Sequence, residues 1–249
     1  MGTALPAAGI RGRSATPCAS VRLDRPSPNF GPRRDGLRPC LVVLHYTGMQ
    51  TADLALDRLC DPQAEVSAHW FVRETGECLS LVPEEMRAWH AGAGEWAGLG
   101  DVNSRSIGIE LANTGAHPFP APQMAALETL LAQVIARWNI PAQGVIAHSD
   151  MAPDRKSDPG PRFDWRRLAL AGLSVWPEPL PAPGTPDIAR FHRDACAFGY
   201  PRRATSEAIL AALRLRFRPW ASGPFDAMDA AIAEDLANRF AVDGARSGA

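Results

Sequence analysis

Two histidines stand at the ends of apolar segments that are typical of buried strands. His45 follows the apolar residues 41–44, and His148 follows residues 145–147. In α/β folds, strand ends are the places where side chains leave the core and meet a cleft. Asp158 comes ten residues after His148, in a loop segment rich in Pro and Gly. Two imidazoles and a carboxylate would leave one corner of a zinc tetrahedron open for a water molecule, so these residues suggest a hydrolytic metal centre.

Two further charged residues have the types that hydrolysis at such a centre would use. Glu110 lies on the non-apolar face of the alternating segment 106–111, where a carboxylate is costly unless it is paired or used. It could take a proton from the water and pass it to a leaving nitrogen. Lys156 is the single lysine among 26 basic residues, and it could stabilise an oxyanion on the attacked carbonyl.

Residue types and spacing alone leave ordinary structural roles open. His45 and His148 are far apart in the chain, and no short ligand motif such as H-E-x-x-H links them. A histidine at a strand end is often a hydrogen-bonded structural residue. Asp158 could form a turn before proline. Glu110 could be exposed or ion-paired, and Lys156 could be a solvated loop charge.

Composition excludes several classes of protein. The chain has 249 residues, of which 46% are hydrophobic and 21% charged, as in folded soluble domains. With 26 basic against 27 acidic residues, nucleic acid is not expected as the main partner. No stretch approaches about 18 uninterrupted apolar residues, so no membrane span is predicted. The five cysteines include no C-x-x-C pair, which argues against a disulfide scaffold and a four-thiolate zinc site.

Hydrophobic periodicity predicts an α/β domain over residues 39–176, in which strands and helices alternate. One predicted helix runs from an N-cap at Thr51 to Leu59. Another covers residues 123–138, where apolar residues recur at spacings of three and four until Pro141. The predicted strands cover residues 41–44, 69–72, 78–82, 106–111 and 145–148, and the second and third form a hairpin around Thr75-Gly76.

The flanking segments differ in composition from this domain. Residues 1–38 are rich in Pro, Gly, Arg and Ser and predict an irregular N-terminal arm that wraps onto the domain. Residues 177–186 are a Pro-rich, extended linker. Residues 187–243 contain three amphipathic stretches, which predict three short helices near the lower size limit for independent folding.

Six segments, taken in order, carry a family resemblance over residues 22–176. Together they closely resemble the type 2 zinc-dependent N-acetylmuramoyl-L-alanine amidases, relatives of the peptidoglycan-recognition proteins. The arm motif RPSPNF at 25–30 is similar to the start of the branch that cleaves murein fragments and intact murein. The six segments are LVVLHYTG at 41–48, VSAHW at 66–70, RAWHAG at 87–92, NSRSIGIELAN at 103–113, AHSD at 147–150 and KSDPGP at 156–161.

The resemblance implies a mixed central β-sheet with helices packed on it and one zinc ion in a groove above the sheet. The family's zinc ligands fall on His45, His148 and Asp158, its catalytic glutamate on Glu110, and its oxyanion lysine on Lys156. The implied reaction is hydrolysis of the amide between N-acetylmuramic acid, or its 1,6-anhydro form, and the L-alanine of the stem peptide. The partner is then peptidoglycan or a muropeptide.

Five further residues match the region where the family holds sugar and peptide. Aromatic rings suit the apolar faces of a sugar, an asparagine suits peptide amides, and an arginine suits a stem-peptide carboxylate. Core packing is the alternative for both tryptophans. The histidine is expected to contact a ligand residue and not the metal, since three ligand positions are already filled. These residues are Trp89, His90, Trp96, Asn103 and Arg162.

The resemblance leaves alternatives for function and compartment. Residues 187–243 resemble a degenerate peptidoglycan-binding module, with a small helical packing domain as the alternative. A non-catalytic muropeptide-binding or sensing protein on the same fold would be favoured by loss of a zinc ligand, and none is lost. A phage-type lysin would use the same chemistry. Because no export signal is visible, the cytoplasm is the expected compartment. The periplasm or cell envelope is the alternative, since the arm and the C-terminal segment resemble exported relatives.

Overall fold

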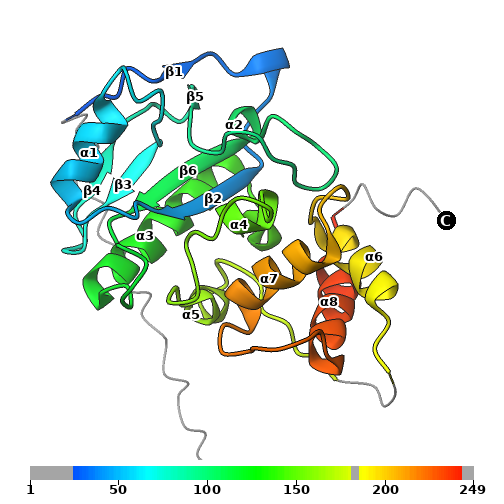
Figure 1. Ribbon diagram of the computed structural model, residues 1–249. Coiled ribbons are helices and arrows are strands. Elements are labelled where there is room, and N and C mark those ends of the chain that lie inside the picture. Colours follow the sequence, from blue (N-terminus) through cyan, green and yellow to red (C-terminus); the bar gives the residue numbers. More distant parts are fainter. Residues whose placement is uncertain (1–24, 181–184, 243–249) are drawn as a thin grey trace, which may run out of the picture.

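The protein is built around a five-stranded mixed sheet (Figure 1). The structure is a computed structural model, and it describes residues 25–180 and 185–242. The strand order is β4-β3-β6-β2-β7; β3, β6, β2 and β7 are parallel, and β4 is antiparallel to β3. The strands are β2 (Leu41–Tyr46), β3 (Trp70–Val72), β4 (Cys78–Ser80), β6 (Ser106–Leu111) and β7 (Val145–Ala147).

Helices flank this sheet, so the predicted mixed sheet with flanking helices is confirmed. The three predicted C-terminal helices are present and gather beside α4 and α5 (Figure 1). The helices are α1 (Ala52–Cys60), α2 (Val102–Arg105), α3 (Ala121–Trp138), α4 (His148–Met151), α5 (Trp165–Leu170), α6 (Ile188–Phe198), α7 (Ser206–Phe217) and α8 (Ala227–Phe240), with 3-10 turns at Arg34–Gly36 and Ala142–Gly144.

Alternation along β6 separates a core face from a site face. Ile107, Ile109 and Leu111 are fully buried in a core that α3 covers. Glu110 lies on the opposite face, as the alternation predicted. It pairs in parallel register with His45 of β2, so the two side chains share one face and one end of the sheet. The period of two along both strands therefore brings a carboxylate next to an imidazole.

Local sequence signals explain where several elements begin and end. Thr51 caps α1, because its hydroxyl accepts a hydrogen bond from the Leu54 amide at 3.2 Å. The β3–β4 hairpin turns at Gly76, whose φ of +90° is open to glycine and strained for other residues. The predicted strand 145–148 stops one residue early: His148 begins α4, because Asp150 accepts a hydrogen bond from the Ala147 amide and starts a helical turn.

The described part of the N-terminal arm is tied to the domain and is not irregular throughout. Its residues Phe30–Gly31 form β1, which pairs antiparallel with β5 (Arg87–Ala88). Arg33 reaches inward and donates hydrogen bonds to the carbonyl oxygens of Glu84 and Ser106, at 2.7 and 3.1 Å. Burial lowers the pKa of Arg33 to about 10. Residues 1–24 of the predicted arm lie outside the described residues.

The C-terminal helices share a hydrophobic core with the site face of the sheet. Val43 and Ile146, on the same side as His45, pack in one buried cluster with Phe198 of α6 and Leu213 of α7. The helices therefore complete the core of the sheet domain. Four residues of the predicted linker, 181–184, lie outside the described residues.

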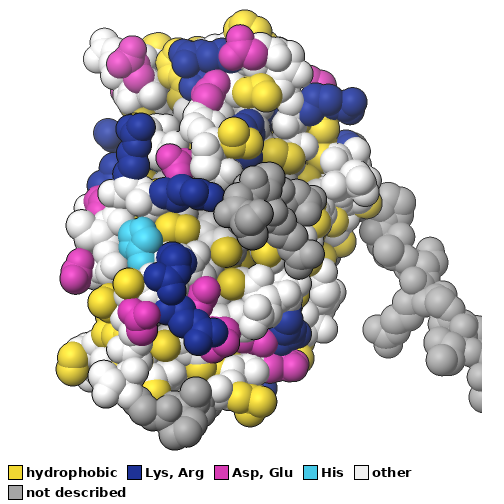
Figure 2. Space-filling model, turned by 90° about the vertical axis from the view of Figure 1, so that its right-hand side faces the viewer, with side chains coloured by type: hydrophobic (Ala, Val, Ile, Leu, Met, Phe, Trp, Pro, Cys, Tyr) yellow, Lys and Arg dark blue, Asp and Glu magenta, His cyan; other side chains and the backbone are white. Residues whose placement is uncertain are grey.

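The helices and one face of the surface can be compared with the composition of the chain. Within the described ranges, every helix is too short or too polar to cross a bilayer. On the face shown in Figure 2, basic and acidic side chains are interspersed, in keeping with 26 basic and 27 acidic residues in the chain.

The buried carboxylate of Glu84 joins β3 and α3 through hydrogen bonds. Its carboxylate accepts hydrogen bonds from the indoles of Trp70 and Trp138 and from the guanidinium of Arg137. Burial would raise the pKa of Glu84, but these bonds outweigh it and hold the pKa below 4.5. Since the folded-state pKa lies below the unfolded one, the stabilisation is complete above pH 4.5 and disappears as the pH falls through the folded-state pKa.

We expect Glu84→Gln to lower the free energy of unfolding by about 1–3 kcal/mol at neutral pH, because buried donors lose a charged acceptor. The difference from the unchanged chain should shrink as the pH falls through the lowered folded-state pKa of Glu84, where the carboxylate becomes protonated. Urea unfolding at a series of pH values measures it. Glu77→Gln, at an exposed ion pair with Arg73, is the control and should change little. A difference that stayed constant until the protein unfolds in acid would contradict the assignment.

Candidate metal centre and substrate cavity

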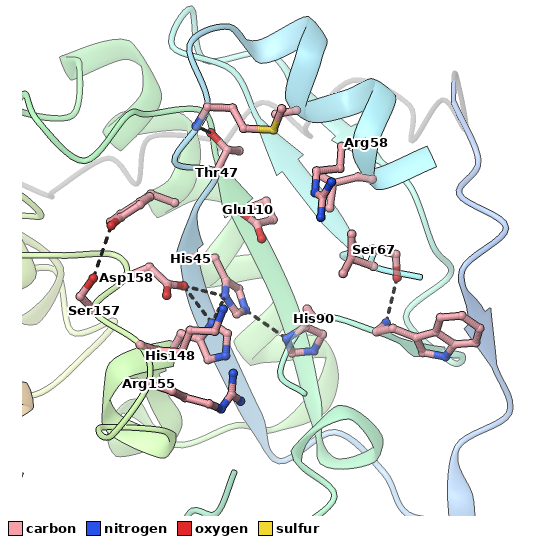
Figure 3. Close-up of a pocket in the computed structure, with 17 residues that line it drawn as sticks. His45, Thr47, Arg58, Ser67, His90, Glu110, His148, Arg155, Ser157 and Asp158 are labelled. Atoms are coloured by element: carbon pink, nitrogen blue, oxygen red, sulfur yellow. Dashed lines mark hydrogen bonds and ion pairs between the residues drawn. The ribbon is translucent and has the colours of Figure 1, made fainter. Parts of the chain in front are cut away.

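Three buried side chains converge above the end of β2 (Figure 3). His45 Nδ1 lies 2.9 Å from His148 Nδ1 and 2.9 Å from Asp158 Oδ2, and His148 Nδ1 lies 3.0 Å from that same oxygen. These separations approach the edge of about 3.3 Å between the ligand atoms of a tetrahedral zinc ion with bonds of about 2.0–2.1 Å. The sequence placed these three residues together correctly, and the structure identifies them as a possible metal site.

Backbone geometry explains the convergence. His45 belongs to β2, and His148 is the first residue after β7, which pairs in parallel with β2. Neighbouring parallel strands bring their carboxyl ends to the same edge of the sheet. Asp158 is on the loop after α4, and its carbonyl oxygen accepts a hydrogen bond from the Ser149 amide at 3.0 Å. The short helix α4 therefore sets the position of both ligands that follow β7.

Hydrogen bonds determine which nitrogen of His148 carries its proton. Nε2 lies 3.0 Å from the carbonyl oxygen of Ala91, so it must donate. In the neutral ring, Nδ1 then has only its lone pair, and that lone pair points toward His45 and Asp158.

A chain of three polar groups determines the tautomer of His45. The Ser106 hydroxyl donates to the carbonyl of Val102 and so accepts from His90 Nε2 at 3.1 Å. His90 Nδ1 therefore accepts from His45 Nε2, also at 3.1 Å, which leaves a lone pair on His45 Nδ1. Burial lowers the pKa of His45 to about 4 and that of His90 well below its usual value, so both rings are neutral at pH 7.

The resulting donor set fits a divalent cation. Two imidazole lone pairs and the carboxylate of Asp158 face one another without a hydrogen atom between them. The Asp158 carboxylate supplies the third donor atom, at 2.9 Å from His45 Nδ1 and 3.0 Å from His148 Nδ1. Three such groups repel each other unless a cation lies among them. Two nitrogen ligands and one oxygen ligand suit zinc and leave a fourth corner free.

His90 has a specific place beneath this centre. A Cβ atom added at Gly108 would lie 2.4 Å from Cγ of His90, so the glycine in β6 makes room for the imidazole against the sheet. The Asn103 side-chain oxygen accepts hydrogen bonds from the amides of His90 and Ala91, at 3.1 and 2.8 Å. The loop that carries His90 is therefore fixed, and His90 contacts His45 as the sequence suggested.

Glu110 lies beside the centre with an unsatisfied carboxylate (Figure 3). Its Oε2 atom finds no hydrogen-bond partner among the described residues. Burial, with the nearby Asp158, raises the pKa of Glu110 to about 8. A carboxyl group with a pKa near the working pH can both accept and return a proton. The ion-paired alternative for Glu110 is therefore not what the structure shows.

A cavity of about 410 Å³ opens over these groups. The predicted residues Trp89, His90 and Lys156 line it together with the three candidate ligands and Glu110. Lys156 is exposed at this cavity, so its amino group is accessible to a bound molecule. Sequence reasoning missed several residues that also line the cavity: Tyr46, Arg58, Ser67, Arg155 and Ser157.

Three predicted substrate residues lie away from the cavity wall. Trp96 is 1% exposed and packs edge-on against Phe198 and Tyr200, so the core-packing alternative holds for it. Asn103 is buried behind the wall, where its oxygen is used by two backbone amides. Arg162 is exposed but does not line the cavity. Their sequence motifs indicated the right region, but burial and side-chain direction decided their contacts.

Comparison with known proteins points to one family. Residues 35–161 match the family model described as N-acetylmuramoyl-L-alanine amidase (Amidase_2). The chain is 37% identical to the N-acetylmuramoyl-L-alanine amidase AmiD of Escherichia coli (strain K12) over 236 residues, 82% of this chain and 84% of that protein. It is 36% identical to the 1,6-anhydro-N-acetylmuramyl-L-alanine amidase AmpD of Salmonella typhimurium (strain SL1344) over 167 residues, 60% of this chain and 89% of that protein.

Solved structures agree with the sequence matches. AmiD from E. coli, in complex with the substrate anhydro-N-acetylmuramic acid-L-Ala-D-gamma-Glu-L-Lys, matches with a TM-score of 0.74 at 35% identity, over 83% of this chain and 92% of that one. AmpDh3 from Pseudomonas aeruginosa, in complex with anhydromuramic pentapeptide, matches with a TM-score of 0.75 at 27% identity, over 90% of this chain and all of that one. Because the family model spans half of the chain and AmiD aligns along most of its length, this protein belongs to the N-acetylmuramoyl-L-alanine amidase family.

Proposed function

We propose that this protein hydrolyses the amide bond between N-acetylmuramic acid, in its 1,6-anhydro form, and the L-alanine of the stem peptide. The observation that carries the proposal is the convergence of His45, His148 and Asp158 beside Glu110 in one cavity. Family membership supports the reaction type. The anhydro sugar is supported by the relatives, since the AmiD and AmpDh3 complexes hold anhydro-muramic peptides and the name of AmpD specifies that sugar.

The proposed cofactor is one zinc ion, held by His45 and His148 through Nδ1 and by Asp158 through Oδ2. When bound, zinc polarises a carbonyl group and lowers the pKa of a coordinated water to about 7. The Nε2 atoms of both histidines are already used, one by Ala91 and one by His90. These outer hydrogen bonds keep each ring oriented and raise the basicity of Nδ1.

Two side chains move or stabilise charge during the proposed reaction. The Glu110 carboxylate, which lines the cavity, takes a proton from the attacking water and returns it to the departing amide nitrogen. The Lys156 ammonium stabilises negative charge on the carbonyl oxygen. All the groups that hydrolysis requires are present, so a non-catalytic muropeptide-binding protein is not favoured.

The rest of the cavity suits a sugar linked to an acidic peptide. The half-buried ring of Trp89 offers an apolar face for the sugar. Arg58, exposed on α1 at the cavity wall, offers a guanidinium for a stem-peptide carboxylate. Arg155 donates instead to the carbonyl oxygens of Ala91 and Ala93, so its role is to hold the loop beside His90.

The compartment stays a prediction: the cytoplasm, with the periplasm or cell envelope as the alternative. Fractionation of cells that express the full chain, followed by detection of the protein in each fraction, decides between them. The cytoplasm would restrict the substrate to soluble muropeptides, whereas the envelope would add intact murein.

The function is tested by incubating the purified protein with an anhydro-muropeptide and analysing the products by mass spectrometry. We expect free anhydro-N-acetylmuramic acid and a peptide that begins with L-alanine. Removing the metal with a chelator should abolish turnover, and adding zinc should restore it. Failure of the zinc-loaded protein to cleave both the anhydro-muropeptide and murein would refute the proposal.

His148→Ala should abolish zinc retention, because only two ligands remain and the outer hydrogen bond to Ala91 is lost. Metal content per chain after desalting, measured by mass spectrometry, checks this. His192→Ala is the matched control, since His192 on α6 bonds to the Ser206 hydroxyl away from the site and the variant should keep its metal. Full zinc content in His148→Ala would show that His148 is not a ligand.

Glu110→Gln should keep zinc bound but reduce kcat by about 10²–10⁴, because the amide is nearly isosteric and cannot accept the proton. Steady-state kinetics together with metal analysis separates this effect from metal loss. The exposed Glu85→Gln serves as a control for a charge change near Arg33. Turnover close to that of the unchanged protein would mean that another group moves the proton.

A further inference from the structure

We propose that Arg216, on α7, one of the three C-terminal helices, is a positioning residue for the metal centre. Through Asp150 it fixes the turn α4, which carries His148 and anchors the backbone of Asp158. The inference rests on the metal centre of the proposed function, and it makes the C-terminal helices part of the amidase site.

Asp150 is the point where the two parts of the chain meet. One carboxylate oxygen accepts a hydrogen bond from the Tyr200 hydroxyl at 2.8 Å. The other accepts from the Arg216 guanidinium at 2.5 Å and from the Ala147 amide at 2.8 Å. The Asp150 and Arg216 side chains both have 0% exposed surface. A carboxylate buried this deeply is held in one place by all of these donors together.

The turn that Asp150 fixes carries the metal ligands. Helix α4 has four residues, begins at His148 and contains Asp150 two positions later. A single helical turn has little stability of its own, so tertiary bonds must hold its shape. The Ser149 amide donates to the carbonyl of Asp158 at 3.0 Å. A displacement of α4 would therefore move two of the three candidate ligands relative to His45.

Arg216 also holds the strand that leads into this turn. β7 is an outer strand of the sheet and pairs with β2. Arg216 Nη2 donates to the Val145 carbonyl oxygen at 3.0 Å and to the Ser174 hydroxyl at 3.2 Å. One guanidinium thus bonds to the start of β7 and to the carboxylate beyond its end. The orientation of His148, which lies between these two bonds, is set from both sides.

The surroundings of Arg216 require a planar guanidinium. Its central carbon lies 4.3 Å from the ring centre of Trp165 and 4.8 Å from that of Phe217. Aromatic faces stack on a guanidinium, and its fork of donors serves several acceptors at once. A lysine would keep the charge but could not reach Asp150 and the β7 carbonyl together. Because a buried ion pair is a weak source of net stability, placing α4 is the effect we assign to it.

The test compares three variants with the unchanged protein. Arg216→Met removes both sets of bonds, and Arg216→Lys keeps the charge alone. Arg214→Met is the matched control: Arg214 is on the same helix and pairs with the buried Asp229 of α8, without a bond to α4. The dissociation constant of zinc is measured by chelator competition on metal-stripped protein, and the exchange rate of the Ser149 amide is measured without metal. The melting temperature of each variant shows whether it is folded at the temperature of these measurements.

We expect Arg216→Met to weaken zinc binding by about tenfold or more, as for loss of an outer bond to a ligand, and to speed exchange at Ser149. Arg216→Lys should fall between this variant and the unchanged protein. Arg214→Met should keep the zinc affinity even where its melting temperature drops. If Arg216→Met does not fold, Tyr200→Phe, which removes one bond to Asp150, takes its place with a smaller effect.

Two results would overturn the inference: unchanged zinc affinity and Ser149 exchange in the folded Arg216 variants, or equal losses in Arg214→Met. Absence of zinc binding by the unchanged protein would instead contradict the proposed function. In that case the exchange rate at Ser149 still decides whether Arg216 holds α4, so the two failures are distinguishable.

Discussion

The structure depends on holding three electron-pair donors close together against their mutual repulsion. His45, His148 and Asp158 lie within 3.0 Å of one another through atoms that carry no proton between them. Such a set is stable when a cation joins it and when the surrounding protein prevents the groups from moving apart. Three hydrogen bonds serve that purpose. The Ala91 carbonyl accepts from His148, His90 accepts from His45, and the Ser149 amide donates to the backbone carbonyl of Asp158.

The two faces of the sheet have different roles. One face is covered by α3 through Ile107, Ile109 and Leu111, and it provides apolar burial. The other carries the site at the strand ends and, below it, a core shared with the C-terminal helices. Burial of the first face under α3 holds β6 in place. The parallel register then sets Glu110 next to His45 on the second face. The raised pKa of Glu110 follows from this partial burial beside Asp158.

Segments far apart in the chain support the loops around the cavity. Arg33 of the arm reaches the carbonyl of Ser106, next to the hydroxyl that sets the proton on His90. From the other end of the chain, Arg216 bonds to Asp150 in the turn after His148. The arm and the C-terminal helices therefore both support segments around the cavity, through the half-buried Arg33 and the fully buried Arg216. An arginine suits this role because it serves several acceptors at once.

Sequence alone indicated the five strands of the main sheet, the helices α1, α3 and α6–α8, and the family. Alternation and spacing are local properties, and Thr51, Gly76 and the segments around His45 carry them directly. It did not indicate β1, β5, α2, α4 or α5. The family resemblance also predicted the three residues that the structure brings together as a possible metal site. Only the tertiary structure decided that Trp96 packs against α6 and that Asn103 bonds to backbone amides. It likewise decided the tautomers of His90 and His45 and the pairing of Arg216 with Asp150. The physical reason is that periodicity shows which face of an element is buried, whereas packing between distant segments decides what that face meets.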